Sequence, residues 1–221
     1  MCGRFALFHS PDQWGLEPLQ VHLPGWHPRY NIAPSQSIAV VHQGATGLEA
    51  HAMLWGFVPH WVREDKPRFQ PINARIEGAA SKPMFRDALA HHRCVIPASG
   101  FYEWQATEQA KQPWFARPKN NGVFLFAGLH SRWMGTGEPV DTVAILTRDA
   151  MGDMSAIHAR MPVMLNPAQA KQWLGPQGAA MAEMLPQPEP MTLYPVNTRV
   201  NRPTNDDDGL IRPAKPVKEN Q

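Results

Sequence analysis

The chain has 221 residues, of which 43% are hydrophobic and 18% charged, and its mean hydropathy is −0.39. This composition is typical of a globular protein with a sizeable core, and because no apolar run approaches the roughly 20 residues that cross a bilayer, it excludes a membrane-spanning role. A net charge of only +2 predicts no general attraction to nucleic acid, so such binding would require a local patch.

Short apolar or alternating stretches predict most of the secondary structure as strands. They lie at Gly3–Phe8, Ser37–His42, Ala50–Trp55, Arg93–Ile96, Gly122–His130, Thr142–Thr147 and Thr192–Val196. Helices are predicted at Gly78–His92, at Pro167–Leu174 behind a cap at Asn166, and at Ala179–Leu185. The 23 prolines are spread along the chain and argue against long helices.

The order of these elements predicts an α+β fold. Because helices and strands do not alternate regularly, we expect a mainly antiparallel sheet or barrel-like core with flanking short helices. Residues 1–200 show no break in composition and are predicted to form a single domain. From Asn201 onward, prolines and charges predict a flexible C-terminal tail over residues 201–221.

The amino-terminal segment has neither a basic region nor a continuous apolar region of the kind found in secretion signals, so we expect a cytoplasmic protein. The two cysteines, Cys2 and Cys94, are too far apart for a metal knuckle and are expected to be reduced thiols, with Cys94 in the core. His91 and His92 are adjacent rather than helically spaced. We therefore expect no metal site. The sequence has no glycine-rich phosphate loop, so it does not suggest nucleotide hydrolysis, and we expect no cofactor.

Cys2 follows the initiator methionine directly. A small second residue favours removal of that methionine, which would leave Cys2 with a free α-amine beside its thiol. The amine has a pKa near ~7.7–8.0 and the thiol near ~8.5, so both are reactive near neutral pH. Such a 1,2-aminothiol attacks an aldehyde twice and closes a five-membered thiazolidine. An ordinary buried cysteine is the alternative, and the motif Met-Cys alone does not decide between them.

Three further segments carry polar side chains in patterns that can serve chemistry. In an extended Pro71–Glu77, Asn73, Arg75 and Glu77 would share one face, although a surface strand edge would explain the same pattern. Glu103 lies between aromatic neighbours, an environment that raises a carboxyl pKa. His158 is expected on the same side of an extended segment as Arg160, and a histidine there can also be purely structural.

Six motifs, taken together, resemble those of the SOS-response-associated peptidase (SRAP) family. They are Cys2-Gly3-Arg4-Phe5, Tyr30-Asn31-Ile32-Ala33-Pro34, Trp55-Gly56-Phe57-Val58-Pro59-His60-Trp61, Asn73-Ala74-Arg75-Ile76-Glu77, Gly100-Phe101-Tyr102-Glu103-Trp104 and His158-Ala159-Arg160-Met161-Pro162. They occur in the family's order over roughly residues 2–165. The resemblance implies a sensor and shield for abasic sites in single-stranded DNA, joined covalently to the lesion through Cys2 and associated with the nucleoid when bound to DNA.

The resemblance also implies roles for individual residues. Cys2 would be the nucleophile, Asn73 would position the cysteine and the sugar, Glu103 would move protons, and His158 would assist opening of the sugar ring; the acid and base roles of the last two are interchangeable at this stage. The residues expected at the DNA share charge, aromatic character or proximity to these four. They are Gly3, Arg4, Pro34, Trp61, Arg75, Lys82, Arg86, Trp104, Thr147 and Arg160.

Two other functions use the same residues. One is a cysteine hydrolase or peptidase with an N-terminal nucleophile, acting on its own leader through Cys2, Glu103 and His158. The other is a non-covalent single-strand binder in which Cys2 is incidental. We expect a monomer that needs no cofactor, with single-stranded DNA containing abasic sites as its partner.

Overall fold

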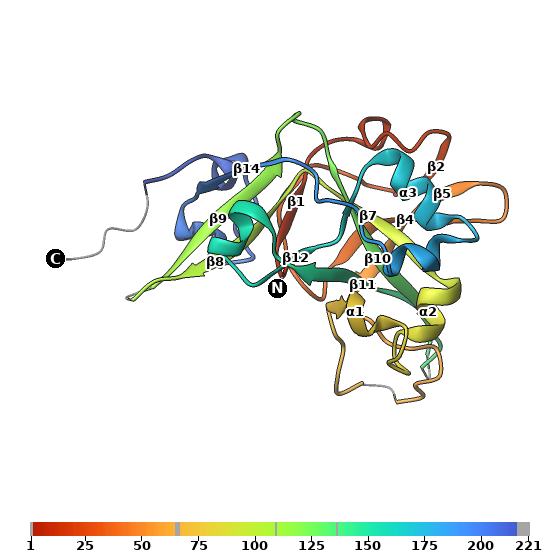
Figure 1. Cartoon of the computed structure of the whole chain (residues 1–221). Helices are drawn as coiled ribbons and strands as arrows, with labels where there is room; N and C mark the ends of the chain where they lie inside the picture. The colour runs from red at the N-terminus through yellow and green to blue at the C-terminus, as the bar shows by residue number, and fades with distance from the viewer. Residues whose placement is uncertain (1, 65–66, 109, 136, 216–221) are drawn as a thin grey trace.

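The computed structural model describes residues 2–64, 67–108, 110–135 and 137–215, and its strands form two sheets (Figure 1). The five-stranded sheet has the order β14 (Met191–Pro195), β9 (Lys111–Pro118), β8 (Gly100–Ala106), β1 (Phe5–Leu7) and β3 (Arg29–Ile32), with every pairing antiparallel. This sheet carries the amino-terminal strand in its interior. The position of Cys2 is therefore fixed by pairing on both sides of β1.

The larger sheet closes into a barrel. It follows the order β12 (Arg160–Pro162), β11 (Val140–Asp149), β10 (Phe124–Trp133), β7 (Arg93–Ala98), β4 (Ser37–Gln43), β5 (Leu48–Trp55) and β2 (Leu19–His22). Strand β13 (Met164–Leu165) pairs with β10, and β6 (Asn73–Arg75) pairs in parallel with β11. Because β5 also pairs with β11, strands β11, β10, β7, β4 and β5 form a closed ring. This arrangement confirms the predicted α+β class with a mainly antiparallel, barrel-like core.

The core lies between the two sheets and fixes the start of the chain. Phe5, completely buried in β1, meets Trp55 edge-on at 5.3 Å and Phe126 at 6.4 Å, so a residue of the smaller sheet packs on two barrel strands. Aromatic pairs of this kind add to the free energy gained from burial alone. The indole of Trp55 also donates to the carbonyl of Ile72, just before β6. The elements that carry Cys2 and Asn73 therefore share one core.

Three α-helices occur in the described residues, and they only partly match the prediction. Helix α3 (Pro167–Leu174) is confirmed, with Asn166 Oδ1 accepting from the backbone of Gln169 at 2.9 Å. The single helix predicted over residues 78–92 is wrong: α1 (Ile76–Ala79) and α2 (Arg86–His91) are separate, because Pro83 lacks an N–H and disfavours helical geometry at the residue before it. None of the described helices has the length and apolarity needed to cross a bilayer.

Single turns of 3-10 helix complete the fold. They are η1 (Pro11–Gln13), η2 (Gly152–Ala156), η3 (Gly178–Ala182), η4 (Thr198–Asn201) and η5 (Asp208–Ile211). The turn η3 stands where an α-helix was predicted over residues 179–185. The predicted strands all occur, while β2, β3, β6, β8, β9, β12 and β13 were not predicted, because polar residues and prolines interrupt their alternation.

Residues 201–215 do not form the flexible tail that their composition predicted. The side-chain Nδ2 of Asn31 donates to the carbonyls of Val200, Arg202 and Asn205 at 3.3, 3.0 and 2.7 Å. Leu210 is completely buried in a small second core. One buried asparagine and one leucine therefore fix a segment whose average composition is that of a loop. The remainder of the predicted tail, residues 216–221, lies outside the described residues.

A half-buried histidine in the barrel should make the fold sensitive to acid. Burial lowers the pKa of His130 to about 3, with His42 and His92 adding to the effect, whereas an unfolded histidine titrates near ~6.5. Between these values only the unfolded chain binds the proton, so the free energy of unfolding falls as the pH falls from about 6.5. We expect His130→Gln to reduce the loss of stability between pH 7.5 and pH 5 by about 1–2 kcal/mol, measured by urea unfolding.

His27→Gln, a change at an exposed histidine, is the control. An equal loss of stability with pH in the wild-type chain and His130→Gln would contradict this assignment.

Candidate functional site

Cys2 lies beside β8 at the junction of the two sheets. Phe5 pairs with Phe101 and Ala6 with Gly100, and the Arg4 carbonyl accepts the N–H of Tyr102 at 2.9 Å. One further step of the same register brings the residue after Cys2 opposite Glu103. Figure 1 shows the start of the chain between β8, β12 and α1, where both sheets are within reach. Cys2 itself is completely buried.

Asn73 ties Cys2 to the barrel. Its Nδ2 donates to the Cys2 carbonyl at 2.8 Å, and β6 holds it in parallel register with Ile145 of β11. The Oδ1 atom of Asn73 is buried and has no hydrogen-bond partner among the described residues. A buried acceptor without a partner costs about 1–3 kcal/mol, so this atom indicates a place where a donor is to be bound.

The surroundings of Cys2 favour the neutral forms of its thiol and of the Glu103 carboxyl group. Burial raises the pKa of the Cys2 thiol far above its usual range, and the nearby Glu103 carboxylate raises it further. Burial likewise raises the pKa of Glu103, while the positive charge of His158 acts in the opposite direction. These effects place Glu103 within electrostatic reach of both Cys2 and His158. The site therefore brings together all four predicted catalytic residues, with Glu103 on β8, Asn73 on β6, Cys2 before β1 and His158 before β12.

A hollow of about 460 Å³ lies at this junction, which we call the His158 hollow. It is lined by Glu103, Trp104, Lys111, His158 and Asn201. The ring of His158 is fixed by backbone contacts, with Nδ1 2.9 Å from the nitrogen of Arg160 and 3.1 Å from its carbonyl oxygen. Because these contacts engage Nδ1, a proton exchanged with a bound molecule would pass through Nε2. Carboxylate, imidazole and ammonium groups thus share one small volume.

Trp104 and Arg4 form one wall of this site. The Trp104 indole donates to Asn201 at 2.8 Å, and the Arg4 guanidinium lies 5.7 Å from the Trp104 ring centre. Arg4 also donates to Asn31 Oδ1 at 2.9 Å and to the Val200 carbonyl at 2.7 Å. Both bonds use Nη1 of Arg4, so this nitrogen braces the wall of the site, and the expected DNA contact of Arg4 stays a prediction.

Arg160 is also turned inward. It is buried, donates to both Glu77 carboxylate oxygens at 2.9 Å, and also bonds Asp149 and the Thr147 carbonyl. The hydroxyl of Thr147 is completely buried as well. Glu77 leaves the predicted face of Asn73 because α1 begins at Ile76 and turns the chain. The structure thus assigns Arg160 and Thr147 internal contacts rather than the DNA contacts we expected.

A second depression, which we call the Phe69 groove, begins at Asn73. It has a volume of about 480 Å³ and is lined by Phe69, Gln70, Pro71, Ile72, Asn73, Ala74, Arg75, Lys82, Met84 and Phe85. Arg75 and Lys82 are exposed there, and Phe69 has 66% of its surface exposed. Asn73, which lines this groove, contacts Cys2. Glu103, which lines the His158 hollow, lies within electrostatic reach of the same cysteine.

The other residues expected at the DNA lie outside these two depressions. Trp61, 53% exposed in the loop between β5 and β6, Arg86 at the start of α2 and the half-buried Pro34 are not among the described residues that line either one. Gly3 is half-buried between Cys2 and Arg4. Sequence reasoning missed Lys111, Asn201 and Phe69, since a lone cation, a tail asparagine and a loop phenylalanine carry no motif.

Comparisons with known proteins place the chain in one family. The model of the "SOS response associated peptidase (SRAP)" family matches residues 1–203. Abasic site processing protein YoqW of Bacillus subtilis (strain 168) is 37% identical over 96% of this chain and 99% of its own length. Abasic site processing protein YedK of Escherichia coli (strain K12) is 29% identical over 97% and 100%, and HMCES of Gallus gallus is 34% identical over 86% and 67%.

Solved structures share the fold. A crystal structure of a protein from Bacteroides thetaiotaomicron, 24% identical, matches 96% of this chain and 100% of its own with a TM-score of 0.85. A phage-related protein from Bordetella bronchiseptica, 28% identical, matches 89% of this chain and 95% of its own with a TM-score of 0.72. The two-sheet architecture is therefore known from experiment.

The inward position of Arg160 generates a prediction about stability. Arg160→Lys keeps the charge but cannot form the forked pair with Glu77 while also bonding the Thr147 carbonyl. Charged hydrogen bonds of this kind contribute about 1.5–3 kcal/mol each, and half-exposure of Glu77 reduces this, so we expect a loss of about 1–3 kcal/mol in thermal or urea unfolding. Arg75→Lys, at an exposed arginine, should leave stability unchanged; equal effects of the two changes would contradict the assignment.

Proposed function

Because the chain belongs to the SOS response associated peptidase family, we propose that it processes abasic sites in single-stranded DNA by linking them covalently to Cys2. The curated relatives described above carry the name abasic site processing protein. The observation that carries the proposal is the buried Cys2–Asn73 contact, held beside Glu103 and the His158 hollow. This is the place where an amine, a thiol and two proton-transfer groups would meet a sugar.

The reaction requires a free amino group on Cys2. In the chain that begins with Met1 the Cys2 nitrogen is an amide and cannot act as a nucleophile. Removal of Met1 converts it to an amine with a pKa near ~7.7–8.0. The amine adds to the C1′ aldehyde of the ring-opened abasic sugar and water leaves, giving a Schiff base. The thiol then adds across the C=N bond and transfers its proton to the nitrogen, so the thiazolidine forms with net loss of one water.

Asn73 is suited to orient both partners of this reaction. Its Nδ2 holds the Cys2 carbonyl, and its unpartnered Oδ1 would accept a hydrogen bond from the released amine. Such a pair of contacts would fix the amine with its lone pair directed at the sugar. Preorganisation of this kind replaces the entropy cost of bringing two reactants together.

Glu103 and His158 would transfer the protons. A carboxyl group whose pKa is raised by burial exchanges protons near neutral pH, as is needed when the amine attacks and water leaves. His158, in the same hollow and fixed through Nδ1, would serve the ring oxygen of the sugar through Nε2 as the closed sugar opens. At the second addition, one of these groups would relay the proton of the neutral, buried thiol to the nitrogen.

The two depressions would receive the strand on either side of the lesion. Lys111 in the His158 hollow, and Arg75 with Lys82 in the Phe69 groove, present cations for phosphates that flank the abasic sugar. Phe69 offers an exposed ring on which a neighbouring base would stack, with an expected contribution of about 1–3 kcal/mol. Contacts of these kinds hold the backbone without reading sequence, as suits a protein that recognises a missing base.

Peptidase action is a second candidate, favoured by the family's name and by the need to remove Met1. Cys2, Glu103 and His158 would also serve a cysteine nucleophile that cleaves a peptide bond. Its thiol would need activation as a thiolate, whereas burial and Glu103 raise the pKa of the Cys2 thiol. Capture of an aldehyde starts from the neutral amine and does not need a thiolate first. This difference ranks the crosslinking function above the peptidase function.

Replacement of Cys2 tests the proposed chemistry. We expect the purified wild-type protein to form a heat-stable adduct with a single-stranded oligonucleotide that contains one abasic site, and Cys2→Ala to form none, as seen on a denaturing gel. Cys94→Ala, at the buried core cysteine, is the matched control and should crosslink normally.

The three candidate functions give different results in this experiment. A peptidase gives no adduct but turns over an amide substrate, and a simple binder gives a gel shift that denaturation abolishes. An undiminished adduct in Cys2→Ala would overturn the mechanism.

The proposed strand path predicts where charge matters. We expect the double variant Arg75→Ala/Lys111→Ala to raise the Kd for single-stranded DNA at least tenfold. Its affinity should also depend less on salt, by an amount equivalent to about one to two lost phosphate contacts. Lys171→Ala, at a lysine of α3 whose ammonium donates to the Glu17 carbonyl, should leave both unchanged. Binding measured by fluorescence anisotropy over a series of salt concentrations decides this. An equal loss of DNA affinity in the double variant and in Lys171→Ala would refute the proposed strand path.

A further inference from the structure

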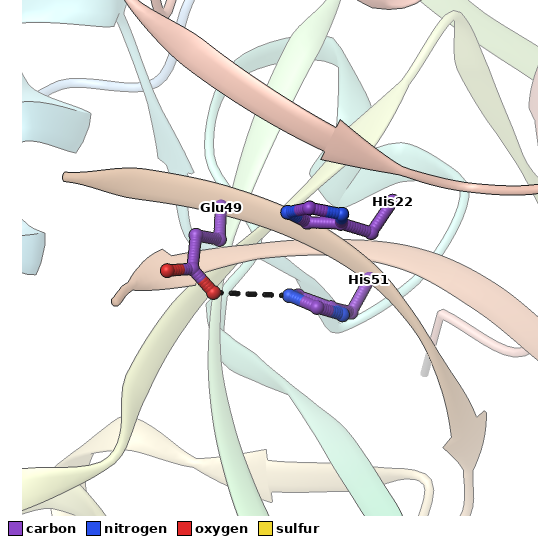
Figure 2. A group of neighbouring side chains, drawn as sticks. All are labelled: His22, Glu49 and His51. Carbon is purple, nitrogen blue, oxygen red and sulfur yellow. Dashed lines mark hydrogen bonds and ion pairs between the residues drawn. The ribbon is translucent and has the colours of Figure 1, made fainter. Parts of the chain in front are cut away.

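A second cluster of chemically active side chains lies on the barrel sheet. His22 of β2 and His51 of β5 are direct partners in a parallel pairing, and Glu49 lies two residues before His51 on the same face (Figure 2). Glu49 Oε2 is 3.1 Å from His51 Nε2, and the two imidazole rings stack at 4.8 Å with 24° between their planes. One ligand atom from each of the three lies within 4.8 Å of the others.

The grouping brings imidazole nitrogens and carboxylate oxygens together on a partly exposed surface. His42, opposite Glu49 in the β4–β5 register, has its ring centre 5.2 Å from that of His51. Three imidazoles thus lie around one carboxylate.

We propose that His22, Glu49 and His51 bind a divalent transition metal ion, for which Zn²⁺ is the best match. Two imidazole nitrogens and one carboxylate oxygen form a donor set that zinc prefers, whereas calcium and magnesium prefer oxygen alone. Tetrahedral zinc with bonds of about 2.0–2.2 Å places its ligand atoms about 3.3–3.6 Å apart. The observed separations reach up to 4.8 Å, so side-chain rotation on this partly exposed surface would bring the ligand atoms closer when the ion binds.

The strand pairing explains what the ion would do. β2 ends the sheet order and is therefore an edge strand, paired only with β5 within the described residues. A metal ion bound by His22 from β2 and by His51 and Glu49 from β5 would join this edge strand to the closed barrel. The fourth position would be taken by water or by His42. None of these residues lines the His158 hollow or the Phe69 groove, so the site is separate from the Cys2 chemistry.

The test is direct titration of Zn²⁺ into the full chain at pH 7.5, followed by calorimetry and by metal analysis after dialysis. We expect one bound equivalent with micromolar or tighter affinity, and a rise in Tm on zinc addition. His51→Gln and His22→Gln should each weaken binding at least tenfold and remove the rise in Tm. At pH 5.5, protonation of the imidazoles should weaken binding in the wild-type chain as well. Mg²⁺ should not bind.

Two further variants exclude other sites on the same chain. Cys2→Ala should keep full zinc binding, since thiols also bind zinc. His91→Gln should keep it too, although His91 lies 3.3 Å from the Asp87 carboxylate in a different histidine-rich patch. Failure of the wild-type chain to bind Zn²⁺ at 100 µM, or loss of binding in Cys2→Ala or His91→Gln with retention in His51→Gln, would overturn the proposal. Crosslinking to DNA is not required for either result.

Discussion

The hydrogen bond between Asn73 and the Cys2 carbonyl is the contact on which the proposed site depends. Residues at the beginning of a chain are usually frayed, because few contacts offset their conformational entropy. Here Phe5 anchors β1 in the core, pairing on both sides fixes its register, and Asn73 holds the residue that precedes the strand. Cys2 is thereby kept in one position, as the proposed reaction, which uses both its amine and its thiol, requires.

The same contact joins the two sheets. Cys2, just before β1, and Glu103 of β8 belong to the side of the five-stranded sheet, whereas Asn73 of β6 and His158, just before β12, belong to the barrel side, so the site exists only where the sheets meet. Two arginines, the half-buried Arg4 and the buried Arg160, brace this junction. Arg4 holds Asn31 and the segment after Val200, and Arg160 holds α1 against β11 through Glu77. These contacts thus maintain the position of the surrounding groups, and exposed cations such as Lys111 are left for the proposed contact with the DNA backbone.

Much of the fold and the four central residues could be predicted from the sequence, and the errors have identifiable causes. Helix α3 was predictable because its cap and its first turn are local. The break between α1 and α2 was missed because the helical spacing of apolar residues continues across Pro83, although this residue lacks an N–H. Composition made residues 201–215 look like a tail, but Asn31, far away in the sequence, supplies their partners. Local composition cannot report such distant contacts.

The same limit applies to the sites. Proximity in sequence to a catalytic residue suggested that Arg160 faces the DNA, yet nothing in the motif gives the direction of its side chain. The ligands of the proposed metal site come from β2 and β5, which become neighbours only through a parallel pairing that spacing does not reveal.

Peptide mapping by mass spectrometry of the product formed with abasic single-stranded DNA tests the central claim most directly. The account predicts a modified peptide that begins at Cys2 with the mass of peptide plus sugar fragment minus one water, unchanged by borohydride and resistant to thiol alkylation. A peptide that still begins with Met1, or one whose thiol is alkylated while the sugar sits on a lysine, would contradict it.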